Sequence, residues 1–148
     1  MNWLSPFVAY WIVKMAAATK HSMLVVDDDP EMAKLIGLAA RSMNYDGRVA
    51  FSARKFMELY NEDQPNVIVM DIIVPEMDGI EMLEWLMDKG CRVAIILISG
   101  HGRYYTRTAA HLAILQGADI LGTLTKPFAL KDLEVLLRQI SDAHAPQS

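Results

Sequence analysis

Several polar residues of this chain each follow an apolar run directly, and together they could form a reactive site. They are Asp27 with Asp28 and Asp29, then Asp71, Ser99 and Lys126. If the apolar runs are neighbouring parallel strands, their carboxyl ends share one edge of a sheet, and the polar groups meet there. Three or more carboxylates in one crevice repel each other and therefore take up protons or recruit a cation. An all-oxygen site without His or Cys suits a hard divalent ion such as Mg²⁺.

A cluster of this kind can handle a phosphoryl group. Asp71 would attack as a carboxylate nucleophile, Lys126 and the metal would spread the charge, and Ser99 would hold a phosphoryl oxygen. By contrast, Asp29 and Asp78 precede helical patterns and are expected to be N-cap residues.

Short apolar runs alternate with helical patterns from residue 23 onward, and this alternation predicts a parallel sheet with helices on both faces. We expect strands at residues 23–26, 48–51, 67–70, 93–98 and 120–125. Apolar residues at helical spacing occupy the intervals, and a last amphipathic helix follows at 130–140. The predicted fold is therefore an α/β, three-layer, doubly wound sheet of five parallel strands and five helices, with the polar groups at its carboxyl edge.

Composition limits the class of protein. A chain of 148 residues is expected to form one domain. Its net charge of −4, from 14 basic and 18 acidic residues, has the wrong sign for attraction of the whole domain to nucleic acid, so we predict no direct nucleic-acid binding. The single cysteine, Cys91, cannot form a disulfide within the chain, which is typical of a reducing compartment, and we expect a cytoplasmic protein.

The leader, residues 1–22, differs from the rest because most of it is an apolar, aromatic block. The block is too short to span a bilayer, which takes roughly 20 residues, and it lacks the basic start of a signal peptide. It could be an interfacial anchor, a segment that docks on an apolar face of a partner, or a leader without a role upstream of a true start at Met15 or Met23. We favour the last, and we expect no membrane contact, a fold over residues 23–141 and a frayed tail over 142–148.

The chain carries four motifs in one order that together resemble the receiver domain of two-component response regulators: LVVDDDP, VIVMDIIVPEMDG, LISGHG and LTKPF. The resemblance covers about residues 23–141. It implies a flavodoxin-like or CheY-like sheet of strand order 2-1-3-4-5. It also implies that a histidine kinase or a phosphotransfer protein passes its phosphoryl group to Asp71, so that the chain is a signalling domain and not an enzyme in the usual sense.

The same resemblance assigns roles at the site. The implied metal ligands are Asp27, Asp28, Asp71 and the backbone carbonyl of Ile73. Asp28 would be a direct ligand, whereas Asp27 would act through water. Ser99 and Lys126 would each contact a phosphoryl oxygen, and the peptide bond between Lys126 and Pro127 would be cis.

The chain departs from the family at Thr123 and at Val74, which stands where methionine is common. Thr123 stands three residues before the lysine, where an aromatic switch residue is usual, so an inward rotation of a ring cannot report phosphorylation here. Ile73 and His101 occupy the two variable positions that flank the phosphoryl group. The apolar Ile73 offers nothing to orient an attacking water, so we expect a long-lived acyl phosphate.

The output of such a receiver is expected to be a partner interaction. The run ADILGTLTKPF resembles receivers found ahead of cyclic-di-GMP phosphodiesterase domains, but no such domain is present in these residues, and we expect a single-domain regulator. The face made by the fourth helix, fifth strand and fifth helix of the receiver is expected to dock a downstream target or a second copy of the chain.

Two rival interpretations stand beside the receiver. In a haloacid-dehalogenase-like, Mg²⁺-dependent phosphatase, Asp27 would be the nucleophile and Asp29 the general acid. Pro30 and the lack of an acidic pair after Lys126 oppose that interpretation, which also leaves Asp71 without a role. In a pseudo-receiver, the chain would bind a partner without phosphorylation, although every chemical position is filled.

Overall fold

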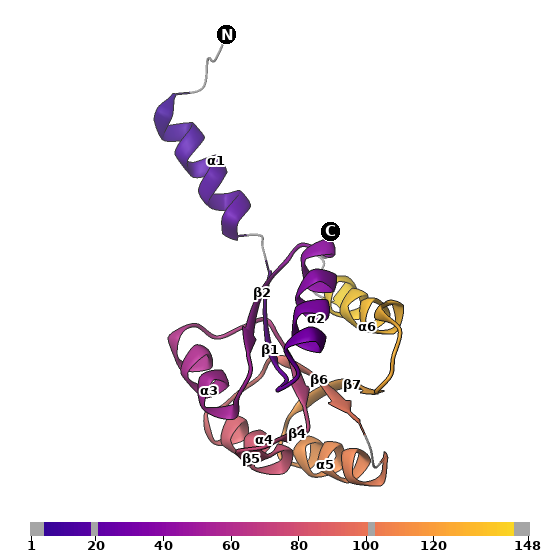
Figure 1. Cartoon of the computed structure of the whole chain (residues 1–148). Coiled ribbons are helices and arrows are strands. Elements are labelled where there is room, and N and C mark those ends of the chain that lie inside the picture. Colours follow the sequence, from indigo (N-terminus) through magenta and orange to yellow (C-terminus); the bar gives the residue numbers. More distant parts are fainter. Residues whose placement is uncertain (1–4, 19–20, 101–102, 144–148) are drawn as a thin grey trace.

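A central sheet of five parallel strands organises the chain in the computed structural model, which describes residues 5–18, 21–100 and 103–143 (Figure 1). The strand order is β2-β1-β3-β6-β7. Its strands are β1 (His21–Val26), β2 (Tyr45–Ala50), β3 (Val67–Asp71), β6 (Ala94–Ser99) and β7 (Asp119–Thr125). The strands β4 and β5 form a separate short ribbon, so β6 and β7 are the fourth and fifth strands of the sheet. The observed order is therefore the predicted order 2-1-3-4-5. The predicted fold class is confirmed.

Helices cover both faces of the sheet and complete the three layers. One face carries α2 (Pro30–Ser42) and α6 (Leu130–Ala143). The other carries α3 (Ala53–Glu62), α4 (Gly79–Asp88) and α5 (Arg103–Leu115). Figure 1 shows these two groups of helices on opposite sides of the strands.

The strands are apolar without alternation because both of their faces are buried. Along β3, Val67 and Val69 pack with α2 and α6, whereas Ile68 and Met70 pack with α3, α4 and α5. All four side chains are fully buried. The apolar run therefore ends where the burial ends, at the edge of the sheet where Asp71 lies.

Short polar side chains start three of the helices, as the sequence pattern predicts. Asp29 accepts a hydrogen bond from the backbone N–H of Glu31 at 3.1 Å, and Asp78 accepts one from Ile80 at 2.8 Å. Ser52 caps α3 in the same way. Each cap satisfies a backbone N–H that has no partner inside its helix, and it sets the residue at which the chain turns away from the sheet edge.

The structure differs from the sequence prediction at several boundaries. The chain contains a two-stranded antiparallel ribbon that was not predicted, formed by β4 (Ile73–Val74) and β5 (Met77–Asp78). The sheet strands β1, β2 and β7 begin earlier than predicted, and α6 reaches Ala143, two residues into the predicted tail. Boundaries shift because a strand continues as long as its neighbour can pair with it, and the pairing partner is not visible in a local pattern.

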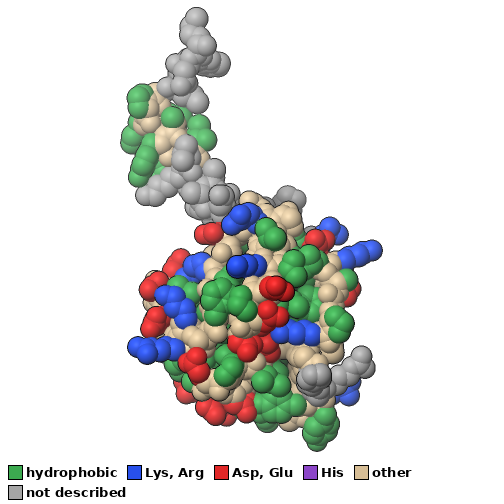
Figure 2. Space-filling view, in the orientation of Figure 1, with side chains coloured by type: hydrophobic (Ala, Val, Ile, Leu, Met, Phe, Trp, Pro, Cys, Tyr) green, Lys and Arg blue, Asp and Glu red, His purple; other side chains and the backbone are tan. Residues whose placement is uncertain are grey.

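The leader forms a helix, α1 (Pro6–Ala18), which Figure 1 shows apart from the sheet. Phe7 is 70% exposed and Tyr10 57% exposed, and Figure 2 shows hydrophobic side chains on the surface of this helix. Over the described part of the chain, no helix has both the length and the apolar character that crossing a bilayer requires. The expectation that the leader has no role in the fold stays a prediction for the residues before His21. The last two residues of the leader belong to β1, which begins at His21.

Gly79 permits a close approach that any side chain would block. A Cβ placed there would clash with the carbonyl oxygen and Cγ1 of Ile72 and would lie 2.9 Å from the Ile72 Cα. We therefore expect Gly79→Ala to lower the free energy of unfolding by about 1–3 kcal/mol, because the backbone behind Asp71 has to move. Urea denaturation would measure the loss.

Gly37→Ala is the matched control. A Cβ at Gly37 would lie 3.8 Å from Val49 Cγ2, an ordinary contact, and alanine favours a helix interior by about 1 kcal/mol over glycine. The control should be neutral or stabilising. Equal effects of the two substitutions would contradict the close approach at Gly79.

Candidate functional site

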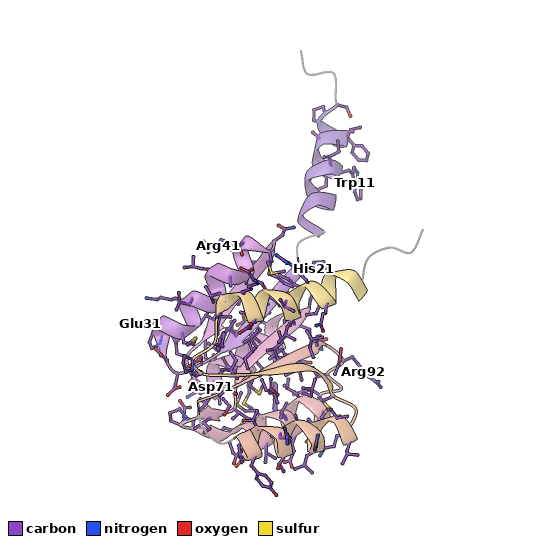
Figure 3. All side chains as sticks on the ribbon, turned by 90° about the vertical axis from the view of Figure 1, so that its right-hand side faces the viewer. Trp11, His21, Glu31, Arg41, Asp71 and Arg92 are labelled. Carbon is purple, nitrogen blue, oxygen red and sulfur yellow. The ribbon has the colours of Figure 1, made fainter. Side chains whose placement is uncertain are left out.

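Three carboxylates meet at the carboxyl edge of the sheet. Asp27 and Asp28 follow β1 and Asp71 ends β3, and these two strands are paired so that Val26 lies opposite Met70. One carboxylate oxygen from each of the three acids lies within 4.8 Å of the others. In Figure 3, Asp71 lies at the same end of the molecule as Glu31 at the start of α2, opposite the end where Arg92 precedes β6. The structure thus brings together the acids that the sequence grouped.

Lys126 joins two of these carboxylates. Its ammonium nitrogen Nζ lies 2.9 Å from Asp71 Oδ2 and 3.0 Å from Asp27 Oδ2. Its backbone N–H donates a 2.7 Å hydrogen bond to the carbonyl oxygen of Ser99, and this bond holds Lys126 beside the end of β6. The Lys126–Pro127 peptide bond is cis, as the resemblance implied.

The remaining oxygens of the buried acids are held by backbone N–H groups. Asp27 Oδ1 accepts a hydrogen bond from Asp29 at 2.9 Å, and Asp71 Oδ1 accepts one from Ile73 at 3.0 Å. Asp27 is fully buried and Asp71 is 5% exposed, whereas Asp28 is exposed. Each buried carboxylate is therefore fixed by one backbone group and one ammonium, and Asp28 leaves the cluster open to solvent.

Burial and mutual charge set the protonation of the cluster. Burial raises the pKa of Asp27 and the charge of Asp71 raises it further, although the backbone N–H of Asp29 and the ammonium of Lys126 oppose this. Burial would lower the pKa of Lys126, but the hydrogen bonds to Asp71 and Asp27 outweigh it and raise that pKa. The lysine therefore stays charged, yet its single positive charge faces three carboxylates. The imbalance leaves room for a further cation.

Ser99 ends β6 next to the acids and is 2% exposed. The register of the sheet places Ile98 opposite Asp71, so Ser99 lies one residue beyond it, and Ser99 itself pairs with Thr125 of β7. The structure thus sets the predicted hydroxyl between the strand ends that carry Asp71 and Lys126.

The predicted variable positions lie on different elements. Ile73 is 56% exposed and belongs to the ribbon beside Asp71. Thr123 is an exposed residue of β7. It borders a groove of about 450 Å³ that is lined by Thr106, Arg107, Ala110, His111, Ile114, Thr123 and Thr125. His101 lies outside the described residues.

One contact near the site was not predicted. The hydroxyl of Tyr105, in the first turn of α5, donates a hydrogen bond to Asp78 Oδ1. The sequence indicated that Asp78 caps a helix, which it does, but it did not pair Asp78 with Tyr105. The two residues are 27 positions apart, so no local pattern could have paired them.

A sequence model of the response regulator receiver domain matches residues 23–138. The chain belongs to this family. The match spans all five strands of the receiver sheet apart from the first two residues of β1, and it includes every member of the cluster around Lys126.

The amino-acid sequence of this chain is similar to parts of several larger regulators. It is 28% identical over 116 residues to the transcriptional regulatory protein TrcR of Mycobacterium tuberculosis, a match that covers 78% of this chain and 43% of TrcR. It is 30% identical over 118 residues to the response regulator MprA of Mycolicibacterium vanbaalenii, covering 80% of this chain and 49% of MprA. The chain thus spans less than half the length of these curated relatives.

Solved receiver structures share the fold. The receiver domain of the Francisella response regulator 1452 superposes with a TM-score of 0.71 at 27% identity, over 84% of this chain and 98% of that domain. A CheY-like receiver protein from Methanospirillum hungatei superposes with a TM-score of 0.73 at 22% identity, over 84% of this chain and 96% of that protein. The second likeness shows the fold alone.

The family assignment favours the receiver over the phosphatase interpretation. Asp29 is exposed, and its side chain caps α2 by accepting a hydrogen bond from Glu31. Asp27, the nucleophile of the phosphatase interpretation, is fully buried beneath Lys126. Asp71, which that interpretation left without a role, lies in the centre of the cluster.

The raised pKa of Asp27 has a consequence for stability. An acid whose pKa is raised by folding stabilises the fold most at a pH below its unfolded value, here 3.8, and this contribution is lost as the pH rises through the folded pKa. Asp27→Asn removes the titrating group. We therefore expect the stability of the native protein, relative to this variant, to fall as the pH rises above about 4.

Urea denaturation at several pH values, with a chelator present to exclude divalent ions, would measure this difference. Asp46→Asn, at an exposed position of β2, controls for the loss of one acidic group. A relative stability that rises with pH in this interval would contradict the assignment.

Proposed function

We propose that this receiver accepts a phosphoryl group on Asp71 from a histidine kinase or a phosphotransfer protein. The observation that carries the proposal is the position of Lys126, whose ammonium lies within 3.0 Å of both Asp71 and Asp27 while Asp28 borders the same cluster. One cation among three carboxylates at an open edge is an arrangement that binds a divalent ion and a phosphoryl oxygen together.

The residues present fit a magnesium ion. The donor set is made of oxygens alone, and Lys126 neutralises only one of the three negative charges. Asp27, Asp28, Asp71 and the backbone carbonyl of Ile73 would hold the ion. When bound, Mg²⁺ would supply the positive charge that lets an anionic phosphoryl group approach an anionic carboxylate. The exposure of Asp28 supports this assignment, because both the ion and the phosphoryl donor have to enter from solvent.

The transfer step follows from the placement of Asp71. A carboxylate oxygen of Asp71 forms a bond to phosphorus while the bond between phosphorus and the donor's imidazole nitrogen breaks, and the imidazole then takes up a proton. The backbone N–H of Ile73 holds one Asp71 oxygen in place. Lys126 would move its hydrogen bond from Asp71 to a phosphoryl oxygen, and Ser99 would donate to another. The receiver would thus catalyse the transfer of the phosphoryl group from the donor to itself, and it would lose that group only slowly.

We further propose that the output is an interaction at the face made by α5, β7 and α6, which are the fourth helix, fifth strand and fifth helix of the receiver. Exposed apolar side chains support this, among them Tyr104 at 84% and Leu115 at 83% exposure on α5, and Val135 on α6. A downstream target or a second copy of the chain would cover them. The location would be the cytoplasm, where a histidine kinase could reach the site.

The phosphorylated residue can be identified directly. Acetyl phosphate with Mg²⁺, followed by borohydride trapping and peptide mapping, should label Asp71, because its carboxylate is the nucleophile. Asp71→Asn should abolish the label, while Asp46→Asn, a remote exposed acid, should retain it. Label on Asp27 would support the phosphatase interpretation, and no label on any aspartate would refute the proposal.

The exposed Ile73 predicts the lifetime of the acyl phosphate. Ile73 lies on the ribbon beside Asp71 and offers no polar group that could orient a water for hydrolysis. We expect Ile73→Asn to shorten the lifetime by about tenfold, which is less than the 10²–10⁴-fold typical of general acid–base catalysis because an amide can orient a water but does not take its proton. Borohydride trapping of samples taken at successive times after removal of acetyl phosphate would measure it.

Ile73→Val is the matched control, since it changes the size of the side chain without adding polarity, and it should leave the lifetime close to that of the native protein. An unchanged lifetime in Ile73→Asn would show that another group controls hydrolysis.

A further inference from the structure

A side-chain hydrogen bond links α5 to the segment that follows Asp71. Tyr105, in the first turn of α5, donates its hydroxyl to Asp78 Oδ1. Asp78 ends β5 and caps α4, with the same oxygen accepting the backbone N–H of Ile80 at 2.8 Å. The ring of Tyr105 is partly buried and packs against the core cluster beneath α3, α4 and α5. Tyr105 therefore connects two helices at the edge where the site lies.

The same link leads back to Asp71 in two steps. Asp78 is paired with Ile73 across the two-stranded ribbon. The backbone N–H of Ile73 in turn donates to Asp71 Oδ1 at 3.0 Å. A continuous set of hydrogen-bonded and paired groups thus runs from the acceptor carboxylate through the ribbon to the first turn of α5.

We propose that Tyr105 is a positioning residue that couples the chemical state of Asp71 to α5 by way of Asp78 and the β4–β5 ribbon. The proposal rests on phosphorylation of Asp71, the proposed function. Phosphorylation converts one Asp71 oxygen to the bridging oxygen of an acyl phosphate and adds negative charge beside Ile73, so the bond from the Ile73 N–H has to adjust. The ribbon has only two residue pairs, and Tyr105 bonds to its last residue, so a shift of the ribbon is passed to α5.

The chemistry of the phenol suits a constant donor. Burial and the carboxylate of Asp78 raise the pKa of Tyr105 to about 12, so the hydroxyl keeps its proton near neutral pH. The bond therefore responds to movement of Asp78 and not to ordinary changes in pH.

On its other side, α5 packs against β7, and a groove of about 450 Å³ borders this contact at Thr123 and Thr125. Tyr105 thus adds a further side-chain connection from α5, one that leads to the segment after Asp71.

The test compares Tyr105→Phe with Tyr104→Phe. Both substitutions remove one hydroxyl from adjacent residues of the same helical turn, but only Tyr105 bonds to Asp78, and Tyr104 is 84% exposed. Hydrogen exchange of the α5 amides would be measured with and without beryllofluoride and Mg²⁺, a stable mimic of the phosphorylated state. Borohydride trapping after acetyl phosphate would be measured in parallel.

We expect α5 exchange to change on addition of beryllofluoride in the native protein and in Tyr104→Phe. Tyr105→Phe should lose most of this change while Asp71 is still labelled by acetyl phosphate. Asp78→Ser should behave like Tyr105→Phe, since serine also caps helices but has no carboxylate to reach the phenol. The double variant should be no more impaired than either single variant, because both substitutions remove the same link.

Two outcomes would overturn the coupling. A full α5 response in Tyr105→Phe would show that the signal runs along the chain from Ser99. An equal loss of α5 protection in both states, with the response intact, would show that the bond only stabilises the helix. Failure of the proposed function looks different, because Asp71 would then take no label in the native protein.

Discussion

The ammonium of Lys126 is the group on which the site depends. Two carboxylates that are almost wholly buried, Asp27 and Asp71, lie within 3.0 Å of it at the ends of adjacent strands. Isolated carboxylates in such surroundings would be neutralised by protonation, because a buried charge without a partner costs several kcal/mol. Lys126 gives both carboxylates a charged partner, yet its single positive charge leaves the cluster short of positive charge. The cluster is therefore held together by ion pairs and can still bind a further cation.

The arrangement of the sheet makes this meeting possible. In a parallel sheet with β1 at the switch point, the strands on either side lead away in opposite directions, and their carboxyl ends surround one crevice. Backbone groups then hold the acids in place: Asp29 donates to Asp27, and Ile73 donates to Asp71. The close approach of Gly79 to Ile72 keeps the segment behind Asp71 near the sheet. The tight packing behind Asp71 and the exposure of Asp28 together suit the proposed phosphoryl acceptor.

The contacts around the site differ between its α4 side and its β7 side. This difference indicates how a change at the site could reach other parts of the domain. Toward α4, the ribbon and the Tyr105–Asp78 bond give a connected path of polar contacts to α5. Toward β7, α5 packs against the strand beside a groove that Thr123 borders. Because α5 also carries exposed apolar side chains such as Tyr104 and Leu115, a shift of its first turn would reach a surface suited to partner contact.

The amino-acid sequence by itself determined the strand and helix types, the helix caps at Asp29 and Asp78, and the grouping of Asp27, Asp71 and Lys126. These features depend on local patterns: apolar runs buried on both faces, short acids before helices, and a polar residue directly after each run. The tertiary structure decided which strands are neighbours, how far each extends, and that Ile73 and Asp78 pair in a ribbon. It alone brought Tyr105 to Asp78. Such contacts join residues that are far apart in the chain, and their geometry is set by the packing of the whole domain and not by the residues beside them.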